Sequence, residues 1–136
     1  MDISEATQFI AANHRAVLVT MRGDGKPQLS PVTVGVDGAG RVVVSSRETA
    51  IKTRNLRRRP FASLCVFSER FFGEWVQVEG PVEIVSLPEA MDGLVDYYRR
   101  ISGEHPDWDD YRATMVRDKR VLIAVTVERA GPDRSG

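Results

Sequence analysis

The alternation of apolar and polar residues predicts several short strands, the clearest of which lies between Trp75 and Ile84. Its apolar positions are expected to face one side, while Trp75 stands among glutamine and glutamate positions on the other. Gly80 and Pro81 in its middle predict a bulge or a sharp bend, as barrels use at their corners. Further strands are predicted over residues 16–21, 28–36, 41–46, 61–67 and 121–128.

Helical spacing of apolar residues appears in four other places. Ser4 is expected to cap the first helix. A basic helix is predicted over residues 49–58, and Pro60 ends it. Pro88 suits the first position of a third helix, and Asp107 is expected to open a fourth through a capping box.

The order of these elements does not alternate between strand and helix. The strands over 16–21, 28–36 and 41–46 are joined by short turns, so we expect an antiparallel meander. About six strands with a few helices predict a mainly β fold, a small antiparallel barrel with attached helices. We expect a single domain over residues 1–136 whose tail, residues 130–136, is disordered.

Composition excludes several classes of function. Of the 136 residues, 42% are hydrophobic and 28% charged, a globular composition. Nineteen basic residues balance nineteen acidic ones, so the whole chain is no polycation for nucleic acid or membrane. Cys65 is the single cysteine, and two histidines without a CxxC pair predict no metal site. Without a signal region or a bilayer-length apolar segment, we expect a cytoplasmic protein.

Local charge departs from this balance over residues 47–59, where six cations stand against one anion. A strand is expected to end and a helix to begin there, and free N–H groups at a helix start attract anions. Ser45, Ser46 and Thr49 add hydroxyl groups, and Lys52 adds a point charge. The pattern favours a phosphate site, although a solvated basic face is the commoner meaning of an arginine run.

Two other features point to a ligand or an interface. Pro31 lies inside a predicted strand and removes a ladder donor, which leaves backbone groups free for a planar heterocycle or marks a blunted edge strand. A large ring such as that of Trp75 on the polar side of a strand is expected to be buried by another group. A dimer interface is favoured over a helix or a bound ring. No Ser-His-Asp or Cys-His set can be assembled, so a cofactor is expected to carry any chemistry.

The run from Lys52 to Arg58 ahead of Pro60, followed by Ala62 and Ser63, resembles the split β-barrel flavin/deazaflavin oxidoreductases, often called pyridoxamine 5′-phosphate oxidase-like. Segments 25–30 and 78–80 stand where that family has similar segments. The run 98–112 resembles an actinobacterial branch that uses coenzyme F420. The resemblance covers roughly residues 5 to 128 and implies an antiparallel split β-barrel.

The resemblance also implies a homodimer with two cofactor sites at the subunit interface. The phosphate-bearing tail of the cofactor is expected on the strand-to-helix junction and the ring on the second strand, with an aromatic residue of the partner subunit closing the site. The matching positions are Gln28, Ser30, Pro31 and Val32 for the ring, Ser45, Ser46, Lys52 and Thr53 with Arg54 or Arg57 for the phosphate, and Trp75 for the closing aromatic.

The function that the resemblance implies is an F420-dependent reductase. It would transfer a hydride from the reduced deazaflavin to a planar conjugated substrate, such as a quinone, an enone or a tetrapyrrole like biliverdin. Flavin mononucleotide (FMN) is the alternative cofactor. Arg54, Arg57, Arg58 and Arg59 extend the positive surface beyond one phosphate, which favours the deazaflavin with its acidic oligoglutamate tail.

The sequence supports three further functions to different degrees. A protein that only binds a cofactor or a tetrapyrrole is one alternative. Binding of nucleic acid through residues 52–59 is another, but the zero net charge and the lack of interleaved aromatic residues count against it. The C-terminal substrate-binding signature of pyridoxamine phosphate oxidases is absent, so oxidation of vitamin B6 is not expected.

Overall fold

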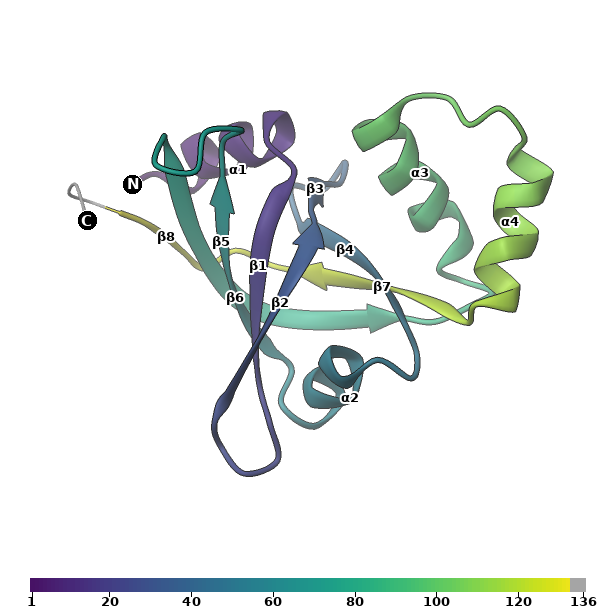
Figure 1. Cartoon of the computed structure of the whole chain (residues 1–136), viewed down its shortest axis with the longest axis horizontal. Coiled ribbons are helices and arrows are strands. Elements are labelled where there is room, and N and C mark those ends of the chain that lie inside the picture. The colour runs from purple at the N-terminus through teal and green to yellow at the C-terminus, as the bar shows by residue number, and fades with distance from the viewer. Residues whose placement is uncertain (133–136) are drawn as a thin grey trace.

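The computed structural model describes residues 1–132, in which eight strands form one curled antiparallel sheet (Figure 1). The strand order is β2-β1-β5-β6-β7-β4-β3, and β8 pairs with β6. This half-barrel with attached helices confirms the predicted fold class. The strands are β1 (Arg15–Met21), β2 (Pro27–Thr33), β3 (Gly35–Val36), β4 (Val42–Arg47), β5 (Phe61–Phe67), β6 (Trp75–Val85), β7 (Arg120–Val125) and β8 (Arg129–Gly131).

Four helices lie among the described residues: α1 (Ile3–Ala12), α2 (Ile51–Arg58), α3 (Met91–Ser102) and α4 (Trp108–Arg117). The cap of α1 is Asp2 and not Ser4, because the Asp2 carboxylate accepts from the Ser4 N–H at 3.1 Å. Pro88 lies in the turn before α3, where its carbonyl accepts from the Met91 N–H. Asp107 caps α4 as predicted. None of the helices within residues 1–132 has the length and apolar character to cross a membrane.

The predicted corner of the barrel lies at Gly80 and Pro81. The first half of β6 pairs with β5, and from Val82 onward the strand pairs with β7. Figure 1 shows β6 curving from one half of the sheet into the other. A Cβ on Gly80 would lie 1.8 Å from the backbone oxygen of Thr126. Glycine is therefore required where the two backbones pass each other.

The predicted meander over residues 16–46 forms only in part. The hairpin of β1 and β2 is present, but β2 lies at one end of the sheet while β4 pairs with β3 and β7. The predicted strand 28–36 is interrupted at Val34, whose N–H donates to the His14 carbonyl at 2.8 Å. The apolar run in β4 is buried on both faces, which places it inside the sheet and not at its edge.

The predicted disordered tail begins with an ordered strand. Residues 130–131 belong to β8, which pairs with β6 and buries Ala130 against the main core. Residues 133–136 of that tail lie outside the described residues.

Two apolar clusters lie on opposite faces of β4 and β7. The main cluster contains Ile10 of α1 and Leu56 of α2 together with one face of the strands. The second lies beneath α3 and α4, where Leu94 packs with Val43 and Leu122 from the other face. This second cluster holds the two C-terminal helices against the sheet and sets the position of the cavity described next.

Candidate functional site

A cavity of about 420 Å³ opens between the edge strand β2, the start of α2 and the helices α3 and α4. Within residues 1–132, strand β2 pairs only with β1, so its other edge leaves backbone groups for a ligand. Four of the residues predicted from the sequence come together here. The lining residues are Pro31, Val32, Thr33, Ser45, Lys52, Tyr97, Tyr98, Tyr111, Met115 and Arg120.

Two cations converge on this cavity, and of the two only Lys52 has no ion pair among residues 1–132. Lys52 lies in the first turn of α2 and Arg120 at the start of β7. Burial and the positive charge of Arg120 lower the pKa of Lys52. Within residues 1–132, the buried Nε of Arg120 has no hydrogen-bond partner, and it lies 3.9 Å from the carboxylate of Asp118. A bound anion would relieve the repulsion and supply the missing acceptor.

Tyrosine side chains form the apolar wall of the cavity. The Tyr97 hydroxyl donates to the Thr33 carbonyl at 2.7 Å, and the Tyr111 hydroxyl donates to the Leu94 carbonyl at 2.7 Å. Burial raises the pKa of Tyr97 and raises the pKa of Tyr111 to about 12, so both phenols stay neutral near pH 7. Tyr98 packs against Tyr111 with ring centroids 5.1 Å apart. Anchored, neutral rings of this kind suit a planar ligand.

The hydroxyls of Ser46 and Thr53 lie elsewhere, although both residues were predicted to bind phosphate. Their side chains are buried, their oxygens are 2.9 Å apart, and Thr53 donates to the Arg47 carbonyl at 2.7 Å. Strand alternation explains the difference, because Ser45 faces the cavity and Ser46 faces the core. These two hydroxyls therefore fasten the start of α2 to the end of β4.

Arg54 and Arg57 of α2 differ in the hydrogen bonds and ion pairs of their side chains. The Arg57 guanidinium donates to both carboxylate oxygens of Glu48, at 3.0 and 2.6 Å, and to Ser86 at 3.1 Å. Arg54 is exposed, and its guanidinium makes no hydrogen bond or ion pair with any residue that the structure describes, while its backbone N–H donates to the Ala50 carbonyl. Of the two arginines named as alternatives, Arg54 is the one whose charge is open to a ligand.

Gln28 and Ser30 lie on the half-buried face of β2 but do not line the cavity. The Gln28 Oε1 accepts from the Nδ2 of Asn55 at 3.0 Å. Asn55 was not identified from the sequence, where it reads as one polar residue inside a basic helix. Its side chain is only 2% exposed, and this burial of a polar group is visible only in the folded structure.

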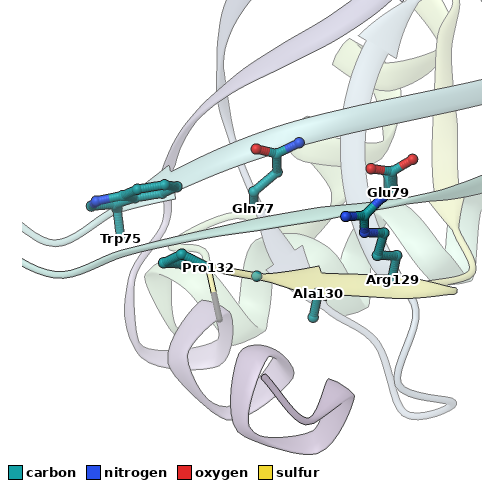
Figure 2. Close-up of a pocket in the computed structure, with 7 residues that line it drawn as sticks. Trp75, Gln77, Glu79, Arg129, Ala130 and Pro132 are labelled. Carbon is teal, nitrogen blue, oxygen red and sulfur yellow. The ribbon is translucent and has the colours of Figure 1, made fainter. Parts of the chain in front are cut away.

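Trp75 lies at a second cavity, of about 220 Å³, on the outer face of the sheet. Figure 2 shows Trp75 at one end of a row with Gln77 and Glu79 along β6, and Arg129 beside Glu79. Trp75 pairs in register with Phe67 and does not line the first cavity of its own chain. A contact between Trp75 and that cavity would require a second copy of the chain.

Comparison with known proteins gives one family. Residues 3–132 match the family described as pyridoxamine 5′-phosphate oxidase. A pyridoxine/pyridoxamine 5′-phosphate oxidase of Azotobacter vinelandii is 32% identical over 119 residues, which cover 82% of this chain and 52% of that protein. The chain therefore spans about half the length of this curated relative.

Solved structures show the same fold. The conserved hypothetical protein Rv2991 from Mycobacterium tuberculosis is 25% identical with a TM-score of 0.78, over 100% of this chain and 92% of that one. A structure described as an F420 reductase is 24% identical with a TM-score of 0.67, over 88% of this chain and 90% of that one. From its sequence match and its curled antiparallel sheet, the chain belongs to the pyridoxamine 5′-phosphate oxidase family and has the split β-barrel fold of that family.

Proposed function

We propose that this protein is an oxidoreductase that binds coenzyme F420 in the cavity between β2, α2 and the C-terminal helices and reduces a planar conjugated substrate. The observation that carries the proposal is the convergence of Lys52 and Arg120 at a cavity walled by tyrosines. Membership of an oxidoreductase family and the fold shared with an F420 reductase support it. When bound and reduced, the deazaflavin supplies a hydride to an electron-poor double bond.

The residues at the cavity fit such a cofactor. Lys52 and Arg120 would hold a phosphate group, with the Ser45 hydroxyl as a further donor. The free edge of β2 at Pro31 and Val32 would lie against the ring, and the anchored tyrosines would keep water away from it. Orientation and exclusion of water are thus the contributions of the protein.

FMN is the second candidate, favoured by the match to pyridoxamine 5′-phosphate oxidases. Both cofactors carry a phosphate that Lys52 and Arg120 can bind. They differ beyond it, because the deazaflavin continues into an acidic tail. The exposed guanidinium of Arg54 has no partner among residues 1–132. It lies on the same helix as Lys52 and supports the longer, acidic ligand.

A homodimer is part of the proposal, because the outer face of the sheet exposes large apolar side chains beside the polar row of Gln77 and Glu79. Cross-strand pairing places Val19 beside Leu29 and Phe67 beside Trp75 on this face. Leu29 is 62% exposed and Phe61 45% exposed. Pairing of two such faces would bury these side chains and would bring Trp75 of one copy toward the cavity of the other.

The phosphate contact is tested by titrating oxidised F420 into the protein and following cofactor fluorescence. Lys52→Met and Arg120→Met should each weaken binding about tenfold or more, because each removes a charged hydrogen-bond donor. Arg117→Met is the matched control, since Arg117 is an exposed arginine in the last turn of α4 and does not line the cavity. Unchanged affinity in both cavity variants would contradict the phosphate assignment.

A further inference from the structure

Asn55 connects the surface of α2 to the edge strand through a buried amide. Its Nδ2 donates to the Thr20 hydroxyl on β1 at 3.0 Å and to the Gln28 Oε1 on β2 at 3.0 Å. Its Oδ1 accepts from the Nη2 of Arg58 at 2.7 Å. With Asn55 2% exposed, these three bonds use both of its N–H groups and its oxygen.

The direction of these bonds follows from the arginine. A guanidinium only donates, so the atom of Asn55 that faces Arg58 is the oxygen, and the other branch of the amide is the NH₂ group. An NH₂ group also only donates, so Gln28 must present its oxygen to Asn55. The Nε2 of Gln28 keeps both hydrogens, for which residues 1–132 provide no acceptor within hydrogen-bond distance.

We propose that Asn55, itself oriented by Arg58, is a positioning residue that fixes Gln28 as a hydrogen-bond donor to the ring of the bound cofactor. The inference rests on the proposed function, and it requires the ring to extend along β2 beyond Pro31 and Val32 to Gln28, which does not itself line the cavity. The pyrimidine end of a flavin or deazaflavin ring carries carbonyl oxygens, which accept such a bond. Without the hydrogen bond from Asn55, the amide of Gln28 could turn and place its own oxygen against a carbonyl oxygen of the ring.

Asn55→Asp tests the direction of the amide with almost no change of shape. The carboxylate can accept from Arg58 and from the Thr20 hydroxyl, but Gln28 must then turn its Nε2 toward position 55. Its Oε1 would face the ring, and binding of oxidised F420 should weaken about tenfold, as in Gln28→Ala. The absorption band of the bound cofactor should shift in the same way in both variants.

A double-mutant cycle separates positioning from general support of the fold. Once Gln28→Ala has removed the amide, Asn55→Asp has nothing left to orient, so the double variant should bind F420 as Gln28→Ala does. Independent structural effects would instead give additive losses. Arg58→Ala frees the Asn55 amide to turn. F420 affinity should then fall about twofold or more, because only part of the protein population keeps the Gln28 amide in the orientation that binds the ring. Arg117→Ala removes an exposed arginine from the last turn of α4; it is the matched control and should bind like the wild type.

Each result bears on a different claim. The positioning role is supported if the wild type binds F420, if Asn55→Asp and Gln28→Ala lose affinity equally, and if the double variant loses no more than either. Wild-type binding with an unchanged Asn55→Asp affinity, or with additive losses, overturns it and leaves the proposed function standing. If Asn55→Asp does not fold, unchanged affinity in Arg58→Ala overturns the role. Failure of the wild type to bind either F420 or FMN overturns the proposed function itself.

Discussion

At the scale of single residues, the cavity places the positive charge of Lys52 in a partly buried position near that of Arg120, which is unfavourable for folding. Burial and the charge of Arg120 lower the pKa of Lys52 below its ordinary 10.5. A lysine with a lower pKa in the folded chain than in the unfolded chain destabilises the fold while it is protonated in both. That destabilisation is present below the folded pKa and is relieved as the pH rises toward 10.5.

Removal of this charge should therefore separate stability from binding. Lys52→Met is expected to unfold at a higher temperature than the wild type near pH 7, although it binds cofactor less well. The difference should shrink as the pH approaches 10.5, where unfolded lysine also loses its proton. Thermal unfolding of the free protein over a pH series measures both effects. A lower melting temperature for Lys52→Met at pH 7, relative to Arg117→Met, would contradict the prediction.

The sequence could identify only part of the cavity residue by residue. Ser45 and Lys52 were found because a strand end, a helix start and a basic run are local signals. Ser46 and Thr53 share those signals, yet burial turns their hydroxyls toward each other. Arg120 could not be found, because it reaches the cavity only when β7 pairs with β4, a contact between segments far apart in the chain.

At the scale of elements, the crossing at Gly80 fixes the corner of β6. Gly80→Ala is expected to lower the free energy of unfolding by about 2 kcal/mol or more, because a backbone oxygen occupies the space of the new methyl group. Gly23→Ala is the control: the nearest atoms to its Cβ are 3.7 Å away, on Arg58, so the change should stay within about 0.5 kcal/mol. Urea unfolding of both variants gives the comparison. Equal stabilities would contradict a tight crossing.

Element prediction succeeded where local signals suffice and failed where pairing decides. The strand 61–67 matches β5, since Pro60 marks its start and apolar alternation runs to its end. The segment 28–36 divides into two strands because Val34 bonds to the His14 carbonyl, a partner that the sequence does not indicate. Strand β8 was missed because a short polar segment becomes a strand only through its pairing with β6.

At the scale of the whole molecule, the proposed dimer predicts that a charge on the outer sheet face disrupts both assembly and binding. Leu29→Glu should yield monomers, because pairing would bury an uncompensated carboxylate, and F420 binding should weaken with it. Val116→Glu is the matched control, since Val116 is 60% exposed on α4, outside the sheet. Size-exclusion chromatography with light scattering measures the mass. A Leu29→Glu protein that remains dimeric would contradict the assignment of this face.

We propose, above all, that a deazaflavin binds at an interface between two copies of this chain. Sedimentation velocity of the wild-type protein with oxidised F420, followed at the visible absorption band of the cofactor, tests it most directly. We predict that F420 sediments with the dimer at one cofactor per chain and that FMN at the same concentration does not. Cofactor that stays behind as free ligand, or that sediments with a monomer, would contradict the account.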